Sequence, residues 1–188
     1  MNQEEFLKLI ADSLGSSGIP YMLAGSFGSN FHGQPRTTND VDIVIDPTRA
    51  QLDHWLDILG DGYYVSRGAV ANALERRSMF NIIDVANGWK ADLIVRKDRP
   101  YSIEEFQRRQ TGIMHGDEYS IASAEDVILT KLEWNNITPS ERQVQDAVNV
   151  AIAQGPKLDQ SYLRKWAPSL GVTEQLEEIL RTAEQAQH

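Results

Sequence analysis

Apolar residues recur at helical spacing at the start of the chain and then give way to a short continuous run. In MNQEEFLKLIADSL, the apolar side chains Phe6, Leu7, Ile10 and Leu14 share one helical face, which predicts an amphipathic first helix. After a glycine-bounded break, the run IPYMLA at 19–24 has the length and composition of a short buried strand. The chain therefore begins with a helix followed by a strand.

Short strands and helices alternate over the next hundred residues. Glycine, proline and capping residues mark the points where one element ends and another begins. The predicted helices are 25–32, a segment after Pro47, 69–77 and a segment after Pro100 that includes Arg108 and Arg109, and the predicted strands are 41–45 and 63–66.

The dipeptide Asn87-Gly88 lies between the apolar runs FNIIDVA and WKADLIV. This arrangement is the strongest short-range signal for a β-hairpin. A turn with two central residues would pair Ile83 with Asp92. Asp84 and Asp92 would then lie on opposite faces of the hairpin, because side chains alternate along a strand.

Only helical patterns follow residue 122. Ser123 stands three residues before Asp126, as in a helix-capping pattern, and apolar residues then recur at helical spacing. Further helices are predicted at 140–154, at 159–167 and after Val172. The chain is therefore predicted to be α+β, with a small mixed sheet flanked by helices in a core domain (1–122) and a helical C-terminal region packed on it (123–188).

Composition narrows the class of protein. The chain has 188 residues, 41% of them hydrophobic, and a net charge of -9, so its overall field repels polyanions, although a local basic patch could still bind nucleic acid. It contains no cysteine, which excludes disulfides, thiolate catalysis and cysteine-ligated zinc. It also has no apolar run of the roughly 20 residues that cross a bilayer and no signal-peptide pattern. We expect a cytoplasmic protein that does not bind a membrane.

Aspartates within an apolar strand are the clearest candidate chemistry. Asp40 and Asp42 are two residues apart on the strand predicted in DVDIVID, so their side chains leave the same face. Like charges this close are unfavourable unless a cation lies between them, and oxygen ligands suit magnesium. Asp92 opens another apolar strand. Alternatively, Asp40 and Asp42 belong to a polar turn and a solvated sheet edge.

Candidate phosphate ligands occur on both sides of these aspartates. Gly25-Ser26 follows a strand and begins a helix, where backbone N–H groups and a hydroxyl bind anions readily, although such a pair is more often a simple turn. Lys131, in the helix after the sheet, could reach a phosphate. Arg36 could contact a phosphate or pair with an aspartate.

The ordered set Gly25-Ser26, Asp40-x-Asp42 and Asp92 resembles the motifs of the polymerase-β-like nucleotidyltransferase superfamily. More closely, RTTNDVDIVID resembles the R-x-T-x-D-x-D form found in the abortive-infection-type nucleotidyltransferase toxins and their uncharacterised relatives. The segment AEDVILTKLEW, followed by SERQVQDAVNV, is similar to the helical motifs of those relatives. Two features depart from the family pattern: the long spacer before Asp40, and SERQVQDA in place of the lysine-containing R-x-K-D form.

The resemblance implies a nucleotidyltransferase fold and a set of residue roles. Asp40 and Asp42 would bind two Mg²⁺ ions, and Asp92 would complete the second ion site and help deprotonate the acceptor hydroxyl. Gly25 and Ser26 would hold the β and γ phosphates of a nucleoside triphosphate. Lys131 would neutralise charge that develops on pyrophosphate.

The activity implied is Mg²⁺-dependent transfer of a nucleoside monophosphate from an NTP to a hydroxyl acceptor, with release of pyrophosphate. The acceptor could be a small molecule, a protein or RNA. The alternative is a catalytically silent nucleotide-binding module, or a toxin–antitoxin type of interaction module with a protein partner. Arg108 and Arg109 are interpreted as a solvated helix face, with a phosphate or acceptor contact as the alternative. Arg142 with Asp146 is interpreted as a structural ion pair one turn apart.

Overall fold

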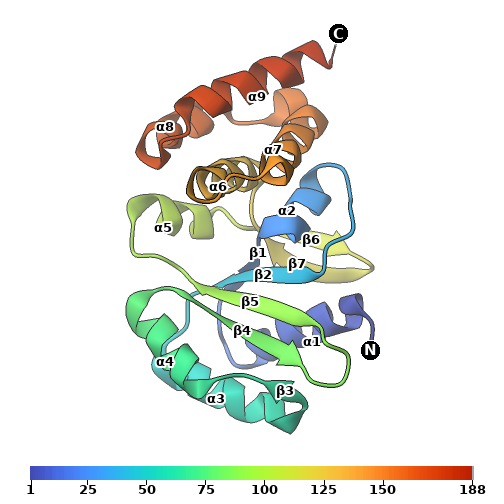
Figure 1. The fold of residues 1–188 in the computed structure, drawn as a ribbon, viewed down its shortest axis with the longest axis vertical. Coiled ribbons are helices and arrows are strands. Elements are labelled where there is room, and N and C mark those ends of the chain that lie inside the picture. Colours follow the sequence, from blue (N-terminus) through green and yellow to red (C-terminus); the bar gives the residue numbers. More distant parts are fainter. Residues whose placement is uncertain (188) are drawn as a thin grey trace. The chain divides into compact units, whose positions relative to one another are not determined.

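Seven strands form one mixed sheet in the computed structural model, which describes residues 1–187 (Figure 1). Their order across the sheet is β3-β4-β5-β2-β1-β7-β6. The strands are β1 (Tyr21–Leu23), β2 (Asp40–Ile45), β3 (Tyr63–Tyr64), β4 (Met79–Asp84), β5 (Lys90–Val95), β6 (Gln110–Met114) and β7 (Asp117–Ile121). β2 runs parallel to β5 and β1 runs parallel to β7, whereas the other neighbours are antiparallel.

Helices precede, connect and follow these strands. They are α1 (Gln3–Ser16), α2 (Gly25–His32), α3 (Arg49–Leu59), α4 (Arg67–Arg76), α5 (Pro100–Gln107), α6 (Ala124–Ile137), α7 (Glu141–Gln154), α8 (Gln160–Leu170) and α9 (Thr173–Gln185). The predicted α+β class, with a mixed sheet and a helical C-terminal part, is confirmed. Within the described residues, no helix combines the length and the apolar character that a membrane crossing requires.

The chain divides into two compact units. The first comprises residues 1–23 and 38–121 and contains the whole sheet with α1, α3, α4 and α5. The second comprises residues 24–37 and the chain from 122 onward, and contains α2 with α6 to α9. The segment between β1 and β2 therefore belongs to the helical unit, and the division into domains at residue 122 stays a proposal.

Alternation along β2 gives the sheet of the first unit one apolar face. Val41, Ile43 and Ile45 are fully buried, whereas the residues between them are only half-buried. Trp55 of α3 packs against Phe80 of β4, with ring centroids 6.4 Å apart. The period of two thus places the core on one face of β2 and leaves the other face for polar side chains.

The β4–β5 hairpin forms where the sequence predicts it, but in a different register. Asn81 lies opposite Asp92, and Ile83 lies opposite Lys90, which is a shift of two residues from the predicted pairing. Because the side-chain period is also two, the shift leaves every side chain on its predicted face. Asp84 therefore still points away from the face that carries Asp92.

The carboxylate of Asp84 accounts for the wider turn. It accepts hydrogen bonds from the backbone N–H of Ala86 at 2.9 Å and from the side-chain amide of Asn87 at 2.7 Å. The Gly88 N–H closes the loop on the Asp84 carbonyl at 2.8 Å, and Gly88 has a φ of +75°. This aspartate supplies a side-chain turn motif that competes with the tight two-residue turn.

Three segments differ from the sequence prediction. The strand expected at 63–66 has only two residues, and the β6–β7 hairpin was not predicted. α5 ends at Gln107, so Arg108 is its C-cap residue and Arg109 lies beyond it. The interpretation of the two arginines as one exposed helix face is therefore wrong, since the helix that begins at Pro100 is shorter than expected.

The predicted cap at Ser123 is present in the second unit. The Ser123 hydroxyl accepts the Asp126 N–H at 3.2 Å and donates to the Asp126 carboxylate at 2.6 Å. The phenol of Tyr162 donates to the other oxygen of the same carboxylate at 2.6 Å. Asp126 is fully buried, so these bonds replace its lost hydration and join α6 to α8.

Arg77 ends α4 in the left-handed region, with a φ of 46° and a ψ of 51°. Its guanidinium lies 2.6 Å from Asp98 and 3.5 Å from Asp46. We expect Arg77→Gly to be more stable than Arg77→Ala by about 1 kcal/mol in unfolding free energy, because only glycine adopts this conformation without strain. In urea unfolding, Arg77→Gly should therefore have the higher midpoint. Both variants lose the same ion pairs, so an Arg77→Ala protein as stable as Arg77→Gly would contradict the prediction.

Candidate active site

The parallel pairing of β2 with β5 brings the candidate metal ligands together in the first unit. Asp42 lies in register with Asp92, and Asp40 lies in register with Lys90. Neighbouring strands are about 4.8 Å apart, and in-register residues of a parallel pair point to the same face. The three aspartates therefore share the face of the sheet opposite the buried side chains of β2. Figure 1 shows the two strands side by side.

The three carboxylates differ in exposure and in their contacts. The side chain of Asp40 is 58% exposed, that of Asp92 is only 11% exposed, and Asp42 is half-buried. The Lys90 ammonium lies 3.0 Å from Oδ2 of Asp92 and 3.4 Å from Oδ1 of Asp40. Its hydrogen bond with Asp92, helped by the charge of Asp40, raises the pKa of Lys90, so this amine is charged at neutral pH.

Asp92 has one buried oxygen without a partner. Its Oδ1 has no hydrogen-bond partner among the described residues, although buried polar atoms are nearly always paired. An unpaired carboxylate oxygen is costly unless a ligand or ion completes it. Within residues 1–187, no three Asp, Glu or His side chains are grouped as a preformed metal site, and the ammonium of Lys90 is the cation beside Asp92 and Asp40.

The second unit presents the start of α2. Gly25 is the first residue of this helix and has a φ of +52°, a conformation that other residues rarely adopt. Ala24 occupies the N-cap position and provides no side-chain cap. The first turn therefore has N–H groups that no N-cap side chain satisfies, and a helix N-terminus in this state attracts anions.

Arg36 is fixed beside this helix start. Its Nε and Nη2 donate to the two oxygens of Asp146 at 2.8 and 2.7 Å, Nη2 donates to the Ser26 hydroxyl at 2.9 Å, and Nη1 donates to the Thr37 carbonyl at 3.2 Å. These four hydrogen bonds leave one of the five guanidinium N–H donors. Of the two roles considered for Arg36, the structure contains the ion pair with an aspartate.

Asp146 joins two cations in the second unit. Besides Arg36, it binds the Lys131 ammonium at 2.8 Å, and Lys131 and Asp146 are each only 5% exposed. Burial raises the pKa of Asp146, but hydrogen bonds from Arg36 and Lys131 outweigh burial and hold this pKa below its usual value of 3.8. The cluster of Ser26, Arg36, Lys131 and Asp146 thus carries two positive charges and one negative charge.

The predicted ion pair of Arg142 with Asp146 is wrong. Asp146 bonds to Arg36 and Lys131 instead, and Arg142 is exposed. Sequence spacing favours a pair one helical turn apart, but Asp146 faces into the helical unit, where the loop after α2 supplies Arg36 and α6 supplies Lys131.

Similar solved structures identify the fold of this chain. No protein-family model and no curated protein matches the sequence. Among solved structures, the antibiotic-resistance factor ANT(2″)-Ia is 13% identical, with a TM-score of 0.61 over 94% of this chain and 97% of that one. A second structure of ANT(2″)-Ia, in complex with adenylyl-2″-tobramycin, is 15% identical, with a TM-score of 0.61 over 90% of this chain and 98% of that one.

A third similar structure is the lincosamide antibiotic adenylyltransferase LnuA, bound to lincomycin. It is 15% identical, with a TM-score of 0.54 over 80% of this chain and 96% of that one. The chain has the nucleotidyltransferase fold. The resemblance read from the sequence is confirmed at this level.

The nucleotidyltransferase fold distributes the predicted site residues over both units. The first unit holds Asp40, Asp42 and Asp92, and the second holds Gly25, Ser26, Arg36 and Lys131. Sequence reasoning missed two residues that contact them, Lys90 and Asp146. Lys90 could have been found, since it precedes Asp92 by two residues on a predicted strand and so shares its face. Asp146 had no such local signal, because its partners lie far away in the sequence.

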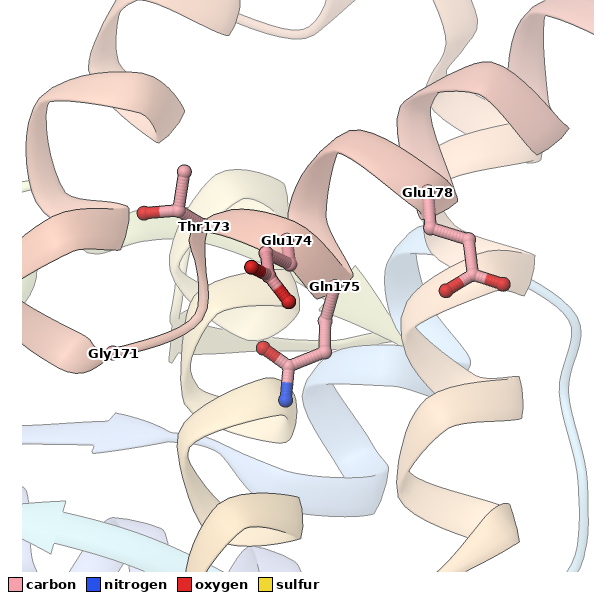
Figure 2. A pocket seen from close by; sticks show the side chains of 5 residues that line it. All are labelled: Gly171, Thr173, Glu174, Gln175 and Glu178. Carbon is pink, nitrogen blue, oxygen red and sulfur yellow. The ribbon is translucent and has the colours of Figure 1, made fainter.

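A pocket of about 500 Å³ lies at the start of α9. Figure 2 shows the residues that line it: Gly171, Thr173, Glu174, Gln175 and Glu178. The Gly171 carbonyl and the Gln175 amide both bond to Asn136 of α6, at 2.9 and 2.6 Å. None of the predicted site residues lines this pocket, and the bonds to Asn136 serve to attach α9 to α6.

Proposed function

We propose that the protein is a Mg²⁺-dependent nucleotidyltransferase, which moves a nucleoside monophosphate from an NTP to a hydroxyl acceptor and releases pyrophosphate. The observation that carries the proposal is the in-register pair of Asp42 and Asp92, with a buried unpaired oxygen on Asp92. The fold supports the proposal, because it is shared with ANT(2″)-Ia, solved in complex with adenylyl-2″-tobramycin, and with the adenylyltransferase LnuA.

The carboxylates fit a divalent metal ion. Asp40, Asp42 and Asp92 supply only hard oxygen ligands, which Mg²⁺ prefers, and Oδ1 of Asp92 has a vacant lone pair where no described group bonds. When bound, Mg²⁺ would polarise the phosphoryl oxygens and neutralise charge on the attacking and leaving oxygens. Asp92 would accept the proton of the acceptor hydroxyl as that oxygen bonds to the α-phosphorus.

The helix start in the second unit fits the phosphates. Backbone N–H groups at Gly25 and Ser26 would donate to phosphate oxygens. Lys131 donates one of its three N–H groups to Asp146, which leaves donors for the departing pyrophosphate. Arg36 would hold the Ser26 hydroxyl in place and has one further N–H for a phosphate. The pyrophosphate leaves as its bond to the α-phosphorus breaks.

A small molecule with a hydroxyl group is the acceptor we propose. The structures with this fold include a complex with adenylyl-2″-tobramycin and a complex with lincomycin. The net charge of -9 on this chain also makes RNA a poor partner. A protein side chain and RNA are the acceptors to compare with small molecules.

Label transfer from nucleotides tests the proposal. Each of the four NTPs, labelled on the α or the γ phosphate, is incubated with the protein and Mg²⁺. The acceptors are cell extract, total tRNA, small-molecule antibiotics and the protein itself. We expect α-label on the acceptor and γ-label in pyrophosphate, both abolished by a chelator. Transfer of γ-label would contradict the mechanism. Mg²⁺-dependent nucleotide binding without any transfer would instead support the catalytically silent module.

An Asp42→Asn variant should lose this transfer, and its matched control is Asp53→Asn. Asp53 is an exposed aspartate of α3 whose ion pair, among the described residues, is with Arg49 one turn away, so its replacement removes a charge at little cost in stability. We expect Asp53→Asn to transfer label at the wild-type rate.

A further inference from the structure

Lys90 places a positive charge among the three aspartates. It begins β5 opposite Asp40 and precedes Asp92 by two residues, so all of these side chains leave one face of the sheet. Its ammonium lies within 3.4 Å of a carboxylate oxygen on each of two strands. The cation therefore bridges β2 and β5 at the point where a divalent ion would bind the same carboxylates.

The bridge leaves negative charge beside the ammonium. Asp40, Asp92 and Lys90 together carry a charge of -1, and of the two oxygens of Asp92 the ammonium contacts Oδ2, while Oδ1 stays buried without a partner in the described chain. An ordinary exposed ion pair leaves no buried carboxylate oxygen without a partner, and it contributes little to the stability of the fold.

We propose that Lys90 acts as a built-in counter-cation, which makes metal binding by these aspartates depend on the nucleotide. This inference rests on the proposed function, because it takes the three aspartates as the metal ligands. A metal ion that binds alone must compete with the ammonium for Asp92 and Asp40. A bound triphosphate brings negative charge that compensates both cations, so metal and nucleotide bind together.

The size of the effect follows from the distances. An ammonium that contacts the same carboxylates as a divalent ion lies within several ångströms of it, and even at an effective dielectric constant of about 20 this repulsion corresponds to one or more factors of ten in affinity. Lys90 is also only partly exposed, with 36% of its side chain accessible, so solvent screens the repulsion incompletely.

Binding of Mn²⁺ to the full chain tests the inference without an activity assay. Free Mn²⁺ is measured by electron paramagnetic resonance, with and without an α,β-methylene nucleotide analogue that cannot be cleaved. Without nucleotide, we expect Lys90→Met to bind Mn²⁺ at least about tenfold more tightly than the wild type. With the analogue, we expect the two affinities to differ by less than about threefold.

Two further variants separate charge from structure. Lys90→Arg keeps the positive charge and should bind Mn²⁺ like the wild type. Lys97→Met removes an exposed lysine just after the other end of β5 and should leave the affinity unchanged. If Lys90→Met does not fold, Lys90→Gln removes the same charge with a polar side chain and carries the test. A lysine with a purely structural role would change the melting temperature of these variants without changing Mn²⁺ affinity.

Failure of the inference and failure of the proposed function give different results. If Lys90→Met binds Mn²⁺ without nucleotide as weakly as the wild type, while Asp42→Asn loses binding in the ternary complex, the role of Lys90 is wrong and the metal site stands. If wild type and Asp42→Asn bind Mn²⁺ equally in every condition, the aspartates are not the metal ligands and both proposals are wrong.

Discussion

Asp42→Asn is expected to lower nucleotidyl transfer by about 10³-fold while the protein stays folded. Asp42 is the aspartate that lies in register with Asp92. Asparagine keeps the shape of the side chain but removes the negative charge that would hold Mg²⁺. Metal ligation supplies several kcal/mol of transition-state stabilisation, and each 1.4 kcal/mol is about a factor of ten in rate. The measurement is the rate of pyrophosphate release at saturating NTP.

Thermal melting with and without ligands separates the loss of a metal ligand from misfolding. Added Mg²⁺ and nucleotide should stabilise the wild type but not the variant. Wild-type transfer by a folded Asp42→Asn protein would remove this residue from the mechanism.

Asp146→Asn is expected to be the most destabilising conservative change in the helical unit. Asp146 is buried and balances Arg36 and Lys131. The variant leaves the ammonium of Lys131, 5% exposed, beside a neutral amide. Breaking a buried charge pair in this way costs about 3 kcal/mol in unfolding free energy. Urea unfolding at neutral pH measures the loss, and NTP affinity should fall as well because Arg36 and Ser26 lose their anchor.

The pH dependence of this loss identifies its cause. The pKa of Asp146 is lower in the folded protein than its usual value of 3.8. Its charge therefore stabilises the fold fully above pH 3.8, and this contribution disappears as the pH falls through the folded-state pKa. The stability gap between wild type and Asp146→Asn should be constant near neutral pH and narrow below pH 3.8.

Arg142→Ala serves as the control for Asp146→Asn. Arg142 is exposed and lies one turn before Asp146 on α7, where the sequence suggested an ion pair. We expect its loss to change stability by less than about 0.5 kcal/mol. An effect as large as that of Asp146→Asn would mean that the local pair matters after all.

The features with a short sequence period were predictable. The faces of β2 and β5 follow from alternation, so the common face of Asp40 and Asp42 could be predicted without the pairing of the strands. The hairpin was placed correctly, and its register was wrong by two residues because the Asp84 carboxylate holds a longer turn. An even shift leaves the faces intact, which is why Asp84 was rightly separated from Asp92.

The contacts between distant segments were not predictable from spacing. Arg36 bonds to Asp146 across 110 residues, and Lys131 reaches the same carboxylate from another helix. Helical spacing pointed to Arg142 instead, since a one-turn pair is the only partner that a local pattern can suggest. The β6–β7 hairpin was not predicted because its turn, His115-Gly116, is not one of the strong hairpin dipeptides.

The parallel alignment of β2 with β5 also affects how the protein folds. Asp42 and Asp92 are 50 positions apart in the sequence (92 minus 42), and α3, α4 and β4 lie between them. Pairing at this separation closes a long loop, which slows folding. The unfolded chain therefore keeps the aspartates apart and has little affinity for a divalent ion. Any ion that binds them in the native protein adds its binding free energy to the stability of the fold almost undiminished.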